Sequence, residues 1–402
     1  MNVTGRALVF AGRNLLRQPG RASVGILGIA AVGALLLDML LLSRGLVVSF
    51  RDLLDSVGFD VRVLASDAAP MGGPRLPDAP IAVQQLAALP EVDEAMMVRF
   101  VDASVDETAA HKFVHFSMTA VDLGRRRPWT VKGGQDLDSA AGAAILLNPR
   151  LAEALHAKPA DVVSIRVACV TERAALPPVT FRVSGIAEFP FDDATWLGGA
   201  ASSDTVMRAC GGGVVPADMI LVASRESFGA EAAAAAIRRV RPDLHPVTNE
   251  EIVTRMQQQG FTYFRQISAV LSTITMLFGF LLITVLLTVS VNQRLGEIAA
   301  LRALGFSRRR VAADVFWQSA LLVGVGGVLA LPLGFVLALW LDRILKAMPQ
   351  IPATLHFFVF EPRALVWQAI LLVVTAVLAA LYPIRLVVTL PIAATLRNEV
   401  IG

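Results

Sequence analysis

The chain has 402 residues, of which 55% are hydrophobic and only 17% are charged. Its mean hydropathy of +0.61 excludes an ordinary soluble globular protein and predicts a membrane protein. The net charge of +3 is small, so the placement of the charges along the chain is more informative than their sum.

The N-terminal residues 1–21 are basic and contain no acid, and we expect a short amphipathic helix on the cytoplasmic surface. Residues 22–42 form the first predicted membrane span. This stretch is too long for the apolar part of a signal peptide, and no A-x-A cleavage site follows it. The sequence therefore predicts an uncleaved anchor.

Asp38 is the one acidic residue inside a predicted span. Carboxylates within a membrane are functional candidates by default, because burying a charge in lipid is costly. Asp38 lies about 16 residues, or roughly 24 Å of helix, beyond the start of the span. We therefore expect its carboxylate to reach the outer headgroups.

Residues 43–265 contain 22 basic and 27 acidic residues, a net of −5, and are predicted to form one large extracytoplasmic domain. Apolar side chains continue at helical spacing after the first span, and residues 249–266 are polar and compatible with a helix. Two helical stalks are thus expected to connect this domain to the membrane.

Between the stalks the pattern is α/β. Predicted strands are residues 61–64, 112–121, 162–170, 179–186 and 219–222. Predicted helices are residues 82–88 and 230–240, and each is followed by Pro, an acidic residue and a short apolar run. This internal echo suggests two related α/β lobes.

Both cysteines, Cys169 and Cys210, fall in this domain, where an oxidising compartment permits a disulfide. Burial as two unpaired thiols is the favoured alternative, because the sequence gives no geometry for a bridge.

Three further spans follow, at residues 266–291, 315–341 and 364–384, separated by a cytoplasmic loop at 292–314 and an outer loop at 342–363, with a tail at 385–402. The N-terminal arm, the loop at 292–314 and the tail carry the excess of Arg. Because positive charge marks the cytoplasmic side, both termini are predicted to be cytoplasmic. Gly326, Ala330 and Gly334 recur every four residues in the third span, which suggests close helix or subunit packing; incidental small residues are the alternative.

The loop sequence NQRLGEIAALRALGFSRRRV places Ile298, Leu301 and Leu304 at a spacing of three. Glu297 and Arg302 lie off that face, and a basic run follows Gly305. The pattern indicates a short amphipathic helix that offers an apolar face to a soluble partner. A solvated loop that merely obeys the positive-inside rule is the alternative.

This loop resembles the signature loop of the FtsX-like permeases, the membrane subunits of ABC transporters of the MacB, LolC/LolE and DevC type. The matching residues are Glu297, Leu301, Arg302, Ala303, Leu304, Gly305, Ser307 and Arg308 to Arg310. The N-terminal segment ALVFAGRNLLRQPGR and the C-terminal segment TLPIAATLR fit the same pattern. The resemblance is strongest in the C-terminal third.

The resemblance implies four transmembrane helices, a large α/β domain on helical stalks, and a coupling helix that inserts into a groove of a cytoplasmic ATPase. The contact residues carried over are Glu297, Leu301, Leu304 and Gly305, with Arg302 and Arg308 nearby. It also implies a bacterial inner-membrane location, an ATPase dimer as partner, and a second permease copy or paralogue. A periplasmic adaptor, an outer-membrane duct and membrane lipids are further expected partners, and no nucleic acid is.

The sequence contains no G-x-x-x-x-G-K-[ST] loop, so ATP and Mg are expected only on the separate ATPase. His111 and His115 lack a third ligand, and no hydrolase motif appears, so neither a metal nor a catalytic residue is predicted. The predicted function is ATP-driven export or extraction of a lipid, lipoprotein, peptide or drug-like cargo. A mechanical regulator of an extracellular partner such as a cell-wall hydrolase is the alternative, and a membrane-anchored sensor without an ATPase is a third.

Overall fold

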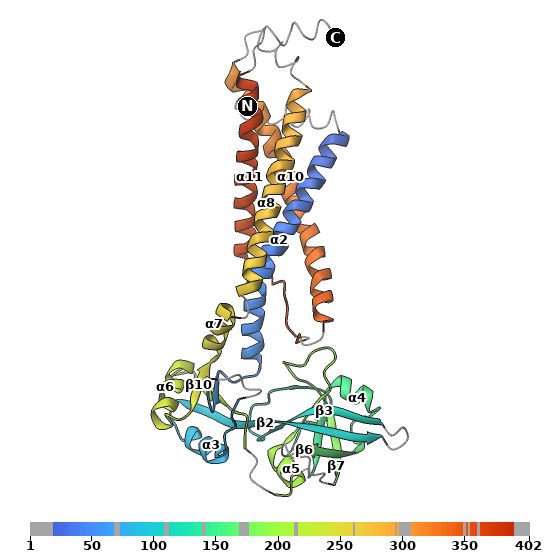
Figure 1. Ribbon diagram of the computed structural model, residues 1–402, viewed down its shortest axis with the longest axis vertical. Helices are drawn as coiled ribbons and strands as arrows, with labels where there is room; N and C mark the ends of the chain where they lie inside the picture. Colours follow the sequence, from blue (N-terminus) through green and yellow to red (C-terminus); the bar gives the residue numbers. More distant parts are fainter. Residues whose placement is uncertain are drawn as a thin grey trace. The chain divides into compact units, whose positions relative to one another are not determined.

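The computed structural model describes residues 19–67, 73–107, 112–138, 142–168, 177–212, 216–259, 262–293, 296, 307–348, 351–352, 354–359 and 362–389. The chain divides into two compact units (Figure 1). The helical unit comprises Met1–Leu46, Phe261–Arg343 and Phe357–Gly402. The sheet unit comprises Val47–Gly260 and Ile344–His356, so the backbone passes between the units at four places.

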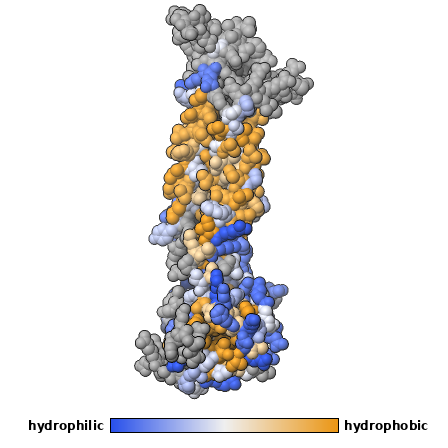
Figure 2. Space-filling model, turned by 90° about the vertical axis from the view of Figure 1, so that its right-hand side faces the viewer, coloured by the Kyte–Doolittle hydropathy of each residue, from blue (hydrophilic) through white to orange (hydrophobic). Residues whose placement is uncertain are grey.

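Four helices in the described part of the chain are long and apolar enough to cross a membrane. They are α2 (Pro19–Ser56), α8 (Thr262–Asn292), α10 (Arg308–Lys346) and α11 (Pro362–Thr389). Apolar side chains also cover the outside of the helical unit, as the orange surface in Figure 2 shows. Helices that are apolar all round satisfy their own backbone hydrogen bonds, which is what a lipid environment requires. Four such helices and a separate α/β unit agree with the predicted fold class, and crossing of the membrane stays a prediction.

The core of the helical unit draws on all four helices. Ile29 of α2, Ile283 of α8, Val323 of α10 and Ala379 of α11 are buried in one cluster. Small residues bring α2 close to α8, since a Cβ on Gly28 would lie 2.8 Å from a methyl of Leu282. The bundle is therefore packed through short side chains as well as through branched ones.

Asp38 corrects one expectation. The carboxylate is fully buried in the helical unit, and neither oxygen has a hydrogen-bond partner among the described residues. The prediction that it reaches the outer headgroups is therefore wrong. Its neighbours on α2, Leu37 and Leu41, pack in a buried cluster with Ala364 of α11.

The sheet unit contains two β-α-β units, one near the start of its sequence and one near the end. Their elements are β1 (Val61–Leu64), α3 (Ala79–Ala87) and β2 (Val92–Glu107), then β9 (Met219–Ser224), α6 (Ala230–Val240) and β10 (His245–Thr248). The strands pair antiparallel in the order β10-β1-β9-β2. This is the split β-α-β arrangement, in which two echoing units complete one sheet. Leu86 of α3 and Ile237 of α6 are buried in one cluster with strand residues such as Val63 and Ile220.

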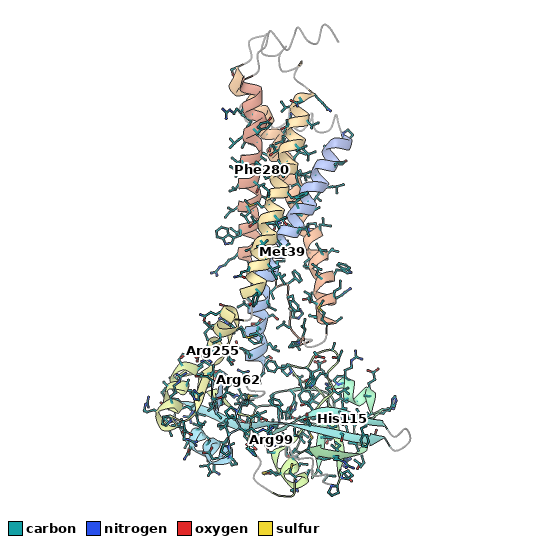
Figure 3. The ribbon with its side chains drawn as sticks, viewed as in Figure 1. Met39, Arg62, Arg99, His115, Arg255 and Phe280 are labelled. Carbon is teal, nitrogen blue, oxygen red and sulfur yellow. The ribbon has the colours of Figure 1, made fainter. Side chains whose placement is uncertain are left out.

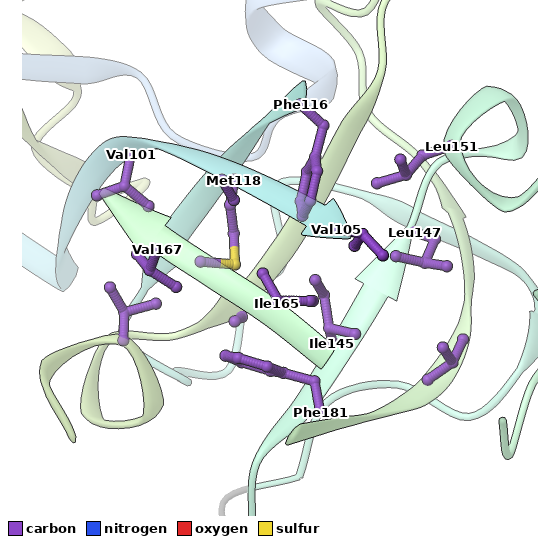
Figure 4. Packing of buried hydrophobic residues seen from close by; sticks show 14 of the residues in the cluster. Val101, Val105, Phe116, Met118, Ile145, Leu147, Leu151, Ile165, Val167 and Phe181 are labelled. Atoms are coloured by element: carbon purple, nitrogen blue, oxygen red, sulfur yellow. The ribbon is translucent and has the colours of Figure 1, made fainter. Parts of the chain in front are cut away.

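β2 and most of the strands that lie between β2 and β9 in the sequence form a closed ring. Its other members are β3 (Lys112–Val121), β5 (Ala144–Leu147), β6 (Val162–Ala168), β7 (Val179–Glu188) and β8 (Gly198–Ser202), with β4 (Thr130–Gly134) beside β7. The ring closes because β6 pairs with both β2 and β7. Every second residue points inward, for example Phe116 and Met118 of β3, and these side chains fill the interior (Figure 4).

The expected pair of related lobes is therefore wrong in arrangement. The two echoing units, around α3 and α6, share one sheet, and the remaining part of the domain is the ring. β1, β3 and α6 have the predicted bounds, while β7, β9 and α3 differ at their ends by a few residues. β6 begins where predicted, and residues 169 and 170 of its predicted range lie outside the described residues. The long strand β2 and the short strands β4, β5, β8 and β10 were not predicted; β8, with the sequence GGAAS, contains no strong strand former.

The first predicted stalk is present, because α2 continues without a break to Ser56. The second is covered by α7 (Asn249–Gln259) and the start of α8, with residues 260 and 261 outside the described part. Cys210 is disulfide-bonded, so the favoured unpaired alternative is wrong. Cys169, the other cysteine of the sequence, lies outside the described residues.

Candidate functional site

The predicted coupling segment joins two apolar helices. α8 ends at Asn292 and α10 begins at Arg308, with the exposed Ser307 directly before it. The coupling residues Glu297, Leu301, Arg302, Leu304 and Gly305 lie outside the described residues, and of Arg308 only the backbone is described. Their assigned roles stay predictions.

The small residues predicted to pack lie on the face of α10 that meets α2. A Cβ on Gly326 would lie 2.7 Å from Cγ2 of Ile29, and one on Gly334 would lie 3.0 Å from a methyl of Leu37. Ala330 is fully buried, and a Cβ on Gly33 would lie 2.7 Å from its methyl group. Larger side chains at these positions require α2 and α10 to move apart.

A buried polar network joins both stalks to the first strand of the sheet unit. Asn249, the first residue of α7, accepts a hydrogen bond from the guanidinium of Arg62 on β1, which Figure 3 labels. The same amide donates to Oδ1 of Asp55, in the last turn of α2, at 2.7 Å, and to the carbonyl oxygen of Phe59 at 3.2 Å. One side chain thus holds the end of the first stalk and the start of the second against β1.

The electrostatics of this junction favour a firm connection. Burial lowers the pKa of Arg62 to about 10, opposed by the carboxylates of Asp55 and Asp60, so the guanidinium stays charged at neutral pH. Arg51 and Glu250 also connect the stalks through an ion pair of 2.6 Å, but both side chains are largely exposed. An exposed pair contributes less than about 1 kcal/mol, so the buried network carries the junction.

Asn249→Ala is expected to destabilise the sheet unit by about 2–4 kcal/mol, because it leaves the buried guanidinium of Arg62 and the buried carbonyl oxygen of Phe59 without their partner. The matched control is Glu250→Ala, which removes only the exposed pair. The measurement is the thermal unfolding of the purified full chain in detergent. Equal shifts for both variants contradict the role given to Asn249.

The outer loop between α10 and α11 belongs to the sheet unit. Pro352 forms an antiparallel backbone bridge with Asp193, and the hydroxyl of Thr354 donates to the carbonyl oxygen of Pro190 at 2.7 Å. The backbone N–H of His356 donates to the hydroxyl of Ser49 on the first stalk, also at 2.7 Å. The loop is therefore a further connection between the apolar helices and the sheet unit, in addition to the stalks.

Asp192, beside this loop, is partly buried. Burial raises its pKa to about 6, although Nδ2 of Asn148 donates to its carboxylate at 2.6 Å and so favours the charged form; the charge of Asp193 raises the pKa further. A carboxyl group whose pKa is raised on folding makes its full contribution to stability at pH values below its unfolded pKa of 3.8. This contribution is lost as the pH rises through about 6.

Asp192→Asn should therefore stabilise the protein at pH 8, by about 1–2 kcal/mol after solvent screening is allowed for, since it removes the charge and keeps an acceptor for Asn148. The gain should shrink below pH 6 and vanish near pH 4. Unfolding temperatures of both proteins across this range test the sign. A gain that grows toward low pH contradicts it.

The three consecutive basic residues Arg125, Arg126 and Arg127 form ion pairs with carboxylates of the sheet unit. Arg125 and Arg126 both pair with Asp93, at 2.8 and 3.0 Å, and Arg127 pairs with Asp136. The run therefore fastens its own loop to the start of β2. His115 is exposed on β3, His111 lies outside the described residues, and no cluster of metal ligands occurs in the described part of the chain.

Sequence reasoning missed the junction for a physical reason. Arg62 and Asn249 are 187 residues apart, and no local pattern links them. One signal was present, because Thr248 and Glu251 have the spacing of a capping box. The hydroxyl of Thr248 accepts from the backbone N–H of Glu251 at 3.2 Å, which places the start of α7 at the sheet.

Residues 269–392 match the model described as the FtsX-like permease C-terminal domain. The chain carries an FtsX-like permease domain. The match includes most of α8, all of α10 and α11, and the whole predicted coupling segment. The resemblance read from that segment is thereby confirmed. No curated protein sequence matches this chain.

Three solved structures are distantly similar to this chain. The periplasmic region of MacB from Actinobacillus actinomycetemcomitans is 11% identical, covering 51% of this chain and 98% of that one, with a TM-score of 0.36. The extracellular domain of the noncanonic ABC-type transporter YknZ from Gram-positive bacteria is 11% identical, covering 47% and 99%, with a TM-score of 0.33. A domain of a putative permease protein from Porphyromonas gingivalis is 13% identical, covering 47% and 87%, with a TM-score of 0.30.

Proposed function

We propose that this permease is the membrane subunit of an ABC transporter and couples ATP hydrolysis by a separate ATPase to movement of the sheet unit. The observation that carries the proposal is the FtsX-like match over residues 269–392, which contains the basic amphipathic segment between α8 and α10. Leu301 and Leu304 would enter an apolar groove of the ATPase, with Glu297, Arg302, Gly305 and Arg308 around them. ATP and Mg would be bound by that ATPase.

Both termini and the coupling segment would face the cytoplasm, and the sheet unit would lie outside the inner membrane. The disulfide at Cys210 supports this orientation, because such bonds persist in oxidising compartments. The clustering of Arg in residues 292–314 supports it independently.

Force would pass from the coupling segment into α8 and α10. From α8 it would reach α7 and the network around Asn249 and Arg62, and from α10 it would reach the outer loop at Pro352 and Thr354. The filled strand ring favours motion of the sheet unit as a rigid body, because packed interiors resist deformation. The working assembly would be two ATPases with two permease copies, or with one copy and a paralogue.

The cargo class would be a lipid, lipoprotein, peptide or drug-like molecule already in the outer leaflet or beyond it. A mechanical regulator would use the same parts to switch an extracellular enzyme. The test is purification of the native complex in mild detergent, with identification of every bound subunit and lipid.

Recovery of an ATPase with an adaptor or an outer-membrane duct is the expected result for an exporter. Recovery of an ATPase with a cell-wall hydrolase favours the regulator. A complex that never contains a nucleotide-binding subunit overturns the proposal and favours a sensor.

A further inference from the structure

The loop of residues 189–197, here called the aromatic loop, presents two large aromatic side chains to solvent. Phe191 is 48% exposed and Trp196 is 43% exposed. The loop lies between β7 and β8, outside the filled interior of the strand ring. An exposed aromatic side chain is unremarkable when it is isolated, but two on one short loop form an apolar projection.

The aromatic loop is held in place by the side chain of Asn148. The side chain of Asn148 is nearly fully buried and donates to the carboxylate of Asp192 at 2.6 Å and to the carbonyl oxygen of Trp196 at 2.8 Å. Oδ1 of the same side chain accepts from the N–H of Leu151 and caps α4 (Pro149–Ala154). The loop is thereby fixed to the end of a helix.

Two further contacts complete this support. Asp193 accepts from the N–H and the hydroxyl of Thr195, at 2.6 and 2.7 Å, and Arg150 donates to the carbonyl oxygen of Ala194 at 2.8 Å. Phe191 and Trp196 are therefore displayed by a rigid backbone. Rigid display reduces the entropy cost of a contact, which is what a binding surface requires.

The aromatic loop also contacts the outer loop between α10 and α11. Pro190 and Asp193 bond directly to Thr354 and Pro352 of the outer loop. That loop leaves α10 after Lys346 and enters α11 at Pro362. Eight residues lead from Lys346 to Thr354 and span at most about 28 Å, so the chain keeps Thr354, a hydrogen-bond partner of the aromatic loop, within that distance of the end of α10.

We propose that Phe191 and Trp196 rest in the outer headgroup region of the membrane. The proposal relies on the orientation given under Proposed function. Aromatic side chains are enriched at membrane interfaces, since the ring is apolar and the indole N–H of Trp donates a hydrogen bond. The guanidinium of Arg150 beside the loop pairs with Glu153 at 3.2 Å, and because both side chains are largely exposed, a lipid phosphate can compete for this cation. A lipid surface is favoured over a soluble partner because both ends of the neighbouring outer loop continue into apolar helices.

The test uses tryptophan fluorescence of the full chain in nanodiscs. Trp317, Trp340 and Trp367 are replaced by Phe, which leaves Trp196 and the buried Trp129 of the sheet unit. Phosphatidylcholine brominated near the headgroup quenches only nearby indoles. The expected result is a loss of emission with the brominated lipid that disappears in the Trp196→Phe variant.

Two relocations of the reporter serve as matched variants. In the Trp196→Phe background, Phe191→Trp should restore the quenching, whereas Phe228→Trp, exposed before α6, should not. Should the triple replacement fail to fold, the same difference is measured between the native chain and its Trp196→Phe variant.

Equal emission of Trp196 in brominated and plain lipid overturns the lipid contact. Co-purification of the ATPase with the same preparation is scored separately. An unquenched Trp196 in a protein that binds its ATPase rejects this inference alone, whereas a quenched Trp196 without any ATPase rejects the proposed coupling alone.

Discussion

Leu301→Asp is expected to abolish co-purification of the ATPase and to leave insertion of the permease unchanged. The substitution places a charge in the proposed apolar contact, and a cost of about 4 kcal/mol lowers an affinity roughly a thousandfold. Leu304→Asp should have the same effect, because the spacing of three puts both residues on one helical face. The measurement is the yield of ATPase recovered with the tagged permease from detergent-solubilised membranes.

The matched control for this experiment is Asn292→Asp. Asn292 is the exposed last residue of α8 and has no assigned contact with the ATPase, so an added charge there should be hydrated and the ATPase should be retained. If the Leu301→Asp permease binds its ATPase at the normal yield, residues 297–305 do not form the coupling surface.

Gly326→Leu is expected to separate α2 from α10 and to destabilise the helical unit by about 3 kcal/mol or more, beyond the usual cost of overpacking. The reason is the position of Ile29, whose Cβ and Cγ2 lie 2.8 and 2.7 Å from the site of an added Cβ, with the carbonyl oxygen of Ile26 at 3.1 Å. A side chain of this size cannot be accommodated without movement of the α2 backbone. Thermal stability in detergent, followed by size-exclusion chromatography after heating, measures the loss.

Gly324 on the same helix provides the control. A Cβ there would meet no atom within 4 Å, so Gly324→Leu should leave the packing of the bundle intact. Both variants add the same side chain and remove a helical glycine. Equal stability of the two proteins contradicts close packing of the Gly326, Ala330 and Gly334 face against α2.

The sequence predicted those features of the permease that are encoded locally. Long apolar runs with at most one charged residue each indicated four long helices. The spacing of apolar residues after the first span indicated that α2 continues as a stalk. β3 was recognisable because it alternates over ten residues. The permease domain was recognised from one basic segment, whose composition and spacing are unusual.

Features that depend on distant contacts were not predictable. The strand ring closes through β6, which pairs with the next strand, β7, and with β2, a strand far earlier in the sequence. No local pattern shows the pairing with β2, and the echo of two helices was misread as two lobes. Asp38 was misplaced because helix length gives its distance along the axis and not the direction of its side chain. Asn148 and Asn249 resemble ordinary turn residues in sequence, and only tertiary structure shows that each holds several segments together.

The docked outer loop has a consequence for dissection of the molecule. Residues 344–356 begin 84 positions beyond the end of the 47–260 stretch (344 − 260), yet they belong to the same compact unit. A fragment that contains only residues 47–260 lacks Pro352, which forms a backbone bridge with Asp193, and Thr354, which donates a hydrogen bond to Pro190. A fragment that keeps the sheet unit intact therefore requires that this short peptide be fused to it or added as a separate peptide.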